Sequence, residues 1–205
     1  MKARSLLLAA ASLLCGAAPP IEFRSAGPEF DAATEDYRFI WAEEGERIVA
    51  ALESATGLVF PANAIEALVS QVPPMMSYDG RSLRLRASYS PDYKRATLVH
   101  ELGHRLAFLL PRSGGLDDHR LLYLFLYDAW TDLYGRDFAG RMAAIERRIP
   151  GTYDYDSAWA WALSMTRAER QARLAELRRS MRATEAAVAP TGSWRPSAGT
   201  AAPHR

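Results

Sequence analysis

Apolar residues recur at helical spacing along most of the chain between residues 30 and 182. This pattern predicts amphipathic helices over 31–54, 61–72, 91–110, 118–134, 137–148 and 167–182, most of them bounded by proline, glycine or capping residues. One segment, 81–88, instead alternates apolar and polar residues with the two-residue period of a half-buried strand. The sequence therefore predicts an α+β, mostly helical domain with a small sheet or hairpin before the helix that begins at Pro91.

The two ends of the chain differ from this central region. Residues 1–18 combine Lys2 and Arg4 with an apolar run that ends in the small residues 16–18, which indicates a signal peptide or an N-terminal anchor. We expect residues 19–29 to be a linker, 30–182 one compact domain, and 183–205 a disordered tail. We therefore expect the protein to be exported, either to the periplasm or as a secreted protein. Membrane contact is expected only through the N-terminal segment, if that segment is retained or is lipidated at Cys15.

The composition excludes several classes of protein. The chain has 205 residues, one cysteine, four histidines and a formal net charge of +1. A single cysteine excludes an intramolecular disulfide framework and the cysteine-rich zinc modules. The near-neutral charge argues against a nucleic-acid partner. A bound metal ion would therefore need histidine and carboxylate ligands.

The predicted helix 91–110 contains the sequence His-Glu-Leu-Gly-His at 100–104. His100 and His104 are four residues apart, so both imidazoles lie on one helix face and can reach the same ion. Glu101 is rotated by about 100° from His100, which places it to accept a proton from water bound to that ion. Zinc held by two imidazoles and a further protein ligand, with water in the remaining position, is typical of a hydrolase. A pair of buried structural histidines is the alternative interpretation.

The third ligand must come from another element, because Leu110 stands where a longer HExxHxxGxxH motif has its third histidine. Asp128 and Asp132 share one face of the predicted helix 118–134, about 6 Å apart along its axis. His119 lies on the opposite face of that helix, about 13 Å from Asp128. We expect Asp128 to be the ligand and Asp132 to accept the outer N–H of a ligating histidine. His119 remains the alternative third ligand.

An HExxH motif followed by a helix with an acid ligand, and by an Asp four residues later, resembles the gluzincin branch of the HExxH zinc metallopeptidases (zincins), which includes the thermolysin-like enzymes. The resemblance covers about residues 81–135, with Asp128 in place of the family's longer Glu. It implies a minimal zincin-like domain with one zinc ion on His100, His104 and Asp128. It further implies Glu101 as the general base and Asp132 as the supporting acid. In such enzymes the strand before the motif helix, here 81–88, binds an extended peptide by edge pairing.

The leading hypothesis is an exported zinc-dependent peptidase that hydrolyses peptide (amide) bonds of a peptide or protein substrate by metal-activated water. The residue that stabilises the oxyanion is left open among Tyr153, Tyr155, Tyr134 and His119. One alternative is a non-catalytic zinc-binding or interaction module on a zincin scaffold, with the basic helix 167–182 facing a partner. Another is a zinc amidohydrolase that acts on a non-peptide substrate of the cell envelope.

Overall fold

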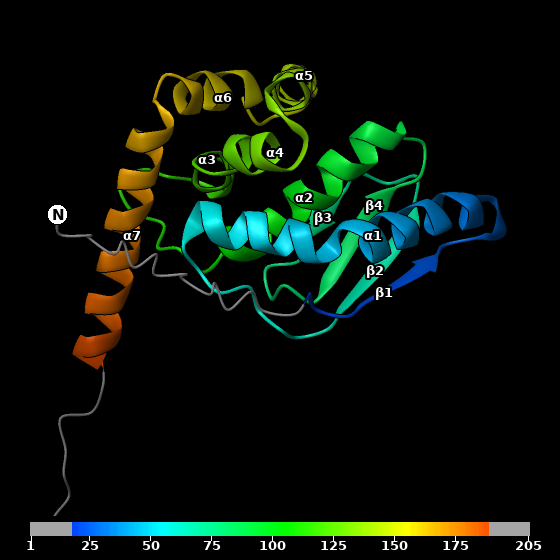
Figure 1. Ribbon diagram of the computed structural model, residues 1–205, viewed down its shortest axis with the longest axis horizontal. Helices are drawn as coiled ribbons and strands as arrows, with labels where there is room; N and C mark the ends of the chain where they lie inside the picture. Colours follow the sequence, from blue (N-terminus) through cyan, green and yellow to red (C-terminus); the bar gives the residue numbers. More distant parts are fainter. Residues whose placement is uncertain (1–17, 189–205) are drawn as a thin grey trace, which may run out of the picture.

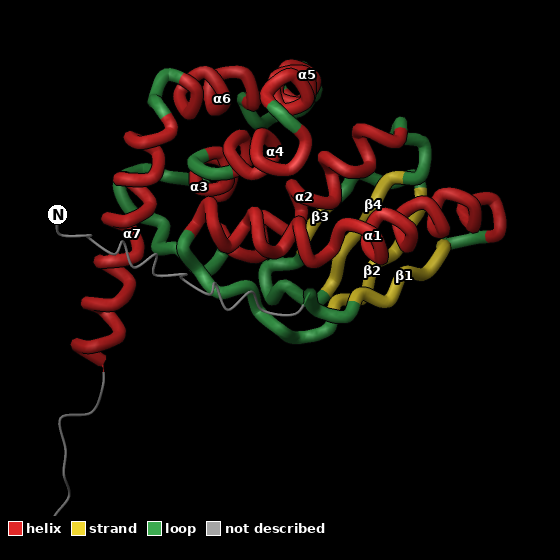
Figure 2. The backbone as a smooth tube through the Cα atoms, viewed as in Figure 1, coloured by secondary structure: helices red, strands yellow, loops and turns green. Residues whose placement is uncertain are grey.

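The computed structural model describes residues 18–188 (Figures 1 and 2). The predicted signal segment, apart from its last residue, and the tail beyond residue 188 lie outside the described residues. Within the described range, four strands form one sheet: β1 (Ile21–Ser25), β2 (Ile65–Ser70), β3 (Met75–Met76) and β4 (Ser82–Arg86). Most other residues of this range are helical, so the predicted α+β, mostly helical class is confirmed.

The helices follow the sequence pattern closely in most places. They are the short 3₁₀ helix η1 (Pro28–Phe30) and α1 (Asp31–Thr56), α2 (Pro91–Ala107), α3 (Asp118–Tyr123), α4 (Leu126–Tyr134), α5 (Arg136–Glu146), α6 (Tyr155–Leu163) and α7 (Arg167–Val188). None of the helices within residues 18–188 is both long enough and apolar enough to cross a membrane. The helix predicted over 167–182 continues into the predicted tail and ends at Val188.

The sheet has the strand order β1-β2-β4-β3, in which the first three strands are parallel and β3 is antiparallel to β4. Phe23, Ala67 and Leu83 stand opposite one another in register, and all three are buried. The residues that alternate with them, such as Glu66 and Leu68, are exposed. One face of the sheet is therefore covered, by α1 and α2, and the other face is open (Figure 1).

Two predictions about the first third of the chain are wrong. Residues 61–72 do not form a helix, because β2 lies there with Ile65, Ala67 and Val69 buried at the two-residue period of a strand. Residues 19–29 are not a linker, because β1 pairs with β2 along its whole length. Both strands are short, and their pairing depends on contacts remote in sequence that local periodicity does not report.

Helix α2 lies beside α1 on the sheet, between the sheet and helices α3 and α4 (Figures 1 and 2). It contacts β3 and β4 on one side and α1, α3 and α4 on the others. It begins at Pro91, as the sequence predicts, with Ser90 as its N-cap, and every residue from Ala96 to Ala107 is buried. The His-Glu-Leu-Gly-His motif is therefore held in the middle of the molecule by packing on several sides.

Candidate metal centre

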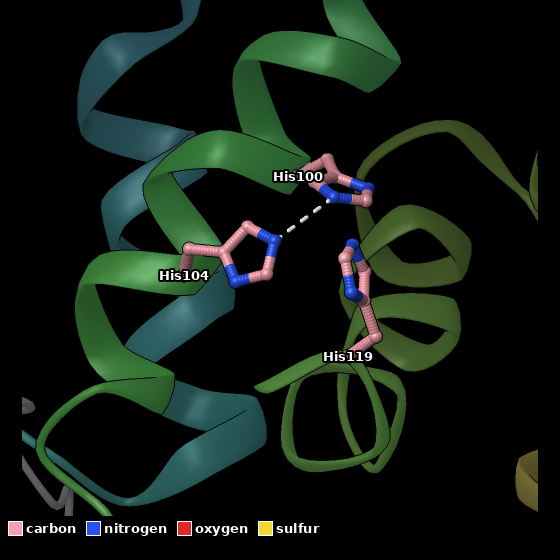
Figure 3. Close-up of side chains that lie close together, drawn as sticks. All are labelled: His100, His104 and His119. Atoms are coloured by element: carbon pink, nitrogen blue, oxygen red, sulfur yellow. Dashed lines mark hydrogen bonds between the residues drawn. The ribbon is translucent and has the colours of Figure 1, made fainter. Parts of the chain in front are cut away.

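Three histidines from two helices converge beside α2 (Figure 3). His100 and His104 come from α2, and their Nε2 atoms are 3.2 Å apart. His119 comes from α3, with its ring centroid 5.7 Å from that of His100 and 4.9 Å from that of His104. One ring nitrogen of each histidine lies within 4.8 Å of those of the other two. The sequence motif and the alternative third residue, His119, thus form one cluster.

His119 reaches this cluster because the helix predicted over 118–134 is broken. The chain turns at Leu124 and Phe125, where Phe125 has φ −136° and ψ −19°, and forms α3 and α4 as two separate helices. His119 and Asp128 would lie on opposite faces only if residues 118–134 formed one straight helix. With the break, α3 has its own direction and brings His119 to α2.

A glycine of the motif allows α3 to approach α2 closely. A Cβ atom added at Gly103 would lie 2.6 Å from Cδ1 of Leu122, well inside van der Waals contact. Leu122 is three residues after His119, so both side chains lie on the same side of α3. The absence of a side chain at Gly103 therefore sets the distance between the helices that carry the three histidines.

The two aspartates predicted to serve the metal lie elsewhere. The carboxylate of Asp128 is buried and accepts hydrogen bonds from Nε and Nη2 of Arg170 on α7, at 3.1 and 2.6 Å. Asp132 accepts two hydrogen bonds from Arg167 at the surface, at 2.7 and 2.6 Å. Neither belongs to the histidine cluster, because both carboxylates on this face of α4 are paired with arginines of α7. The expected roles of Asp128 as ligand and Asp132 as supporting acid are therefore wrong.

Glu146, the last residue of α5, occupies the position expected for Asp132. Its Oε1 lies 2.7 Å from Nδ1 of His100, and its Oε2 accepts a hydrogen bond from Nε1 of Trp159 at 3.1 Å. Glu146 is only 2% exposed. A carboxylate that accepts the Nδ1 proton fixes the tautomer of His100 and leaves a lone pair on Nε2, which faces His104.

Sequence reasoning missed Glu146, although its helix contains a signal. In the predicted helix 137–148, Glu146 follows Met142 by four residues and Ala143 by three, and both are apolar and buried. A carboxylate on the apolar face of a helix requires a buried donor or cation. That requirement marks Glu146 as a candidate functional residue, while the sequence does not identify the donors as His100 and Trp159.

The protonation of the cluster follows from burial and from the neighbouring charges. Burial lowers the pKa of His104 well below its ordinary value, and burial also lowers the pKa of His119 to about 4. Burial opposes the charge on His100 as well, but the carboxylate of Glu146 raises the pKa of His100 above its ordinary value. Burial raises the pKa of Glu101 to about 7. Two of the three imidazoles are therefore neutral at neutral pH, which is the form that binds a metal ion.

The cluster lies on the wall of a pocket of about 1000 Å³. His100, Glu101, His104 and His119 all line this pocket, which we call the large pocket. Its other lining residues are mainly tyrosines, prolines, methionines and a few charged side chains: Pro73, Pro74, Met75, Met76, Tyr78, Arg86, Tyr89, Tyr93, Thr97, Phe108, Asp117, Asp118, Ile145, Glu146, Arg148, Ile149, Pro150, Tyr153 and Tyr155. A substrate much larger than water can therefore reach Glu101 and the histidines.

Two of the tyrosines considered for the oxyanion role stand beside His119. The ring centroids of Tyr153 and Tyr155 are 4.6 and 5.0 Å from that of His119. The hydroxyl of Tyr153 donates to Asp117 at 2.7 Å, whereas within residues 18–188 no hydrogen bond engages the hydroxyl of Tyr155. Tyr134 packs on Phe138 and does not line the large pocket.

The strand at the pocket is not the one expected. Segment 81–88 does contain a strand, β4, but β2 and β3 pair with its two sides. The edge strand is β3, whose two residues, Met75 and Met76, line the large pocket. β3 pairs with only Leu83 and Arg84, so it occupies that edge of β4 over two residues and leaves Leu85 and Arg86 unpaired with it.

The donor set and its surroundings fit a metal ion of the zinc type. Three imidazoles converge with no lysine or arginine in the cluster, and zinc prefers nitrogen ligands of this kind. Nε2 of His100 and Nε2 of His104 face each other at 3.2 Å, and a ring nitrogen of His119 lies within 4.8 Å of the ligand atoms of both. A cation shared by the three rings would bind the lone pairs that converge there.

Comparisons of the chain with protein-family models, with curated proteins and with solved structures find no match. The chemistry of the histidine cluster must therefore be argued from the residues and their geometry alone.

Proposed function

We propose that the protein is an exported zinc-dependent peptidase, with His100, His104 and His119 as the zinc ligands and Glu101 as the general base. The observation that carries the proposal is the convergence of three imidazoles beside a buried glutamate on the wall of the large pocket. The zincin-like character of the domain is part of this proposal. Its export rests on the sequence of residues 1–18 alone.

Each residue of the cluster has a separate task in amide hydrolysis. When bound, zinc polarises a carbonyl group and lowers the pKa of a bound water to about 7. The carboxylate of Glu101 takes a proton from the attacking water and delivers it to the leaving nitrogen, so that one water and one amide become an acid and an amine. Glu146 holds His100 through Nδ1, and Trp159 holds Glu146 in turn.

Tyr155 is the residue best placed to donate to the oxyanion. Its ring stands beside His119, and within residues 18–188 no hydrogen bond occupies its hydroxyl. Tyr153 is the weaker candidate, because donation to Asp117 already uses its proton. A phenol that donates to a developing oxyanion stabilises the transition state more than the substrate.

The test compares zinc-loaded wild type with Glu101→Gln on a mixed peptide library, with mass-spectrometric detection of the products. Glutamine keeps the size of the side chain but cannot accept the proton, so we expect cleavage to fall by about 10²–10⁴-fold while zinc is retained. Asp92→Asn is the matched control on the exposed first turn of the same helix, and it should cleave like wild type.

Equal cleavage by Glu101→Gln and wild type would remove Glu101 from catalysis and contradict the proposal. Zinc binding without cleavage of any peptide would favour the non-catalytic zinc-binding module. Glu101-dependent cleavage of cell-envelope fragments, without cleavage of peptides, would instead favour the amidohydrolase.

A further inference from the structure

A second, smaller pocket adjoins the large one. It has a volume of about 230 Å³, and we call it the small pocket. Tyr78 and Phe108 line both pockets, with their ring centroids 4.9 Å apart. The ring of Phe108 also stacks on that of His104 at 5.5 Å. The two pockets are therefore separated by an aromatic pair, and nothing assigned to the metal centre explains the small one.

An arginine without a counter-charge lines the small pocket. Arg105, the residue after His104, is 4% exposed, and its Nη2 donates to the backbone carbonyl of Asn63 at 2.8 Å. Its Nη1 is buried without any hydrogen-bond partner within residues 18–188. No carboxylate of these residues lies within ion-pair distance of Arg105. The equally buried Arg170, by contrast, has Asp128 as its partner. Burying a guanidinium without an anion is unfavourable, so an anion bound to Arg105 would stabilise the folded protein.

The other charges at the small pocket leave it electropositive. Arg81 lines it as well and forms no ion pair within the described residues. Asp79 is the single acid of the lining, and its Oδ1 already accepts hydrogen bonds from the Ser77 hydroxyl at 2.5 Å and from the Arg81 amide at 3.0 Å. Two guanidinium groups and one carboxylate therefore line the small pocket, and the excess charge is positive.

The turn over Arg105 is shaped by a glycine. Gly80 has φ +68°, a left-handed conformation that L side chains rarely adopt. A Cβ atom at this position would lie 3.0 Å from both Cγ and Nε of Arg105. The turn therefore rests directly on the arginine stem, which limits the positions that the guanidinium can adopt.

We propose that the small pocket binds a small oxyanion, a phosphate, sulfate or carboxylate group, with Arg105 as the main ligand and Arg81 as a second cation. The planar guanidinium binds such groups through two parallel hydrogen bonds, and burial strengthens the interaction. The oxyanion supplies the counter-charge that residues 18–188 do not. This site lies outside the proposed peptidase chemistry and requires no metal ion.

The test measures the thermal midpoint of the full chain without metal, at constant ionic strength and pH, as chloride is replaced by phosphate, sulfate or acetate. Phosphate and sulfate stabilise most proteins non-specifically, so the informative quantity is the midpoint shift of wild type minus that of Arg105→Met. At ten times the dissociation constant we expect this difference to be about 4 °C. Arg136→Met, at an exposed arginine that lines neither pocket, should show the full wild-type shift.

The outcomes separate the sources of the oxyanion. A difference with phosphate and sulfate indicates a tetrahedral anion, and a difference with acetate indicates a carboxylate. Equal shifts in wild type and Arg105→Met, for all three anions, would overturn the proposal. If Arg105→Met does not fold, Arg105→Lys replaces it, because lysine keeps the charge but loses the paired donors, and its shift should be at most half that of wild type. Neither readout uses activity, so failure here leaves the peptidase proposal untouched.

Discussion

Two buried polar clusters follow one another along the chain, one on each side of the break between α3 and α4, and they differ in how far their polar atoms are satisfied. After the break, Asp128 accepts two hydrogen bonds from Arg170. Nη1 of that arginine donates to the carbonyls of Ala162 and Met165. Before the break, His119 joins His100 and His104, and Nε2 of His100 lies 3.2 Å from Nε2 of His104.

This difference favours a structural role for the Asp128–Arg170 pair and a ligand-binding role for the three histidines. A buried ion pair whose donors and acceptors are all paired has no capacity left for a ligand. Removing one partner is destabilising, because it leaves the other charge buried and unpaired. A buried cluster with converging lone pairs has the capacity to bind a cation. The acid that the sequence favoured as a metal ligand is thus part of the scaffold, and the histidine kept as an alternative is part of the proposed site.

The largest effect that would test this comparison is on stability. Arg170→Met leaves the buried carboxylate of Asp128 without a partner, so we expect the free energy of unfolding of the metal-free protein to fall by about 3–5 kcal/mol. Arg167→Met is the control, because it breaks the more exposed pair with Asp132 and should cost less than about 1 kcal/mol. Urea denaturation of both variants measures the two values. Similar losses would mean that the buried pair of Asp128 stabilises the fold no more than the exposed pair of Asp132.

The next effect concerns the support of the metal site. Glu146→Gln removes the charge that orients and polarises His100, so we expect the zinc affinity to fall by about 10–100-fold. Asp132→Asn, at the residue that the sequence favoured for this role, should leave zinc affinity unchanged. Competition with a zinc chelator measures both variants. A loss in Asp132→Asn as large as that in Glu146→Gln would contradict the assignment of Glu146.

The smallest effect tests the close approach of the helices that carry the histidines. Gly103→Ala places a methyl group against Leu122, and we expect a loss of about 1–3 kcal/mol in the free energy of unfolding. Gly140→Ala in α5 is the matched control, because nothing lies within 4 Å of a Cβ atom there. It should stabilise the protein by about 0.5–1 kcal/mol through helix propensity. If both substitutions stabilise the protein in denaturation experiments, α2 and α3 do not pack as closely at Gly103 as we infer.

The parts of the molecule that the sequence predicted correctly are those encoded locally. The first residues of α1 and α2, Asp31 and Pro91, follow from apolar spacing and from the proline, although α1 ends two residues later and α2 three residues earlier than predicted. The proximity of His100 and His104 follows from their separation by four residues on one helix. These features need no knowledge of what packs against them.

The parts that were missed depend on contacts between distant segments. Residues 61–72 satisfy a helical pattern about as well as a strand pattern, and pairing with β1 and β4 decides between the two. The break at Phe125 carries no proline or glycine, so the apolar run of 118–134 gives no sign of two helices. The partners of Asp128 and Glu146 come from α7 and α2, and only the tertiary structure reveals them.

In the proposed metal site, His119 and not Asp128 is the third ligand. The most direct test is the zinc content of purified protein after loading and dialysis, compared between wild type, His119→Ala and Asp128→Asn, with His204→Ala as a histidine control. We predict about one zinc ion per chain in wild type, Asp128→Asn and His204→Ala, and a loss of zinc in His119→Ala. Zinc retained by His119→Ala and lost by Asp128→Asn would contradict the assignment of His119 as the third ligand.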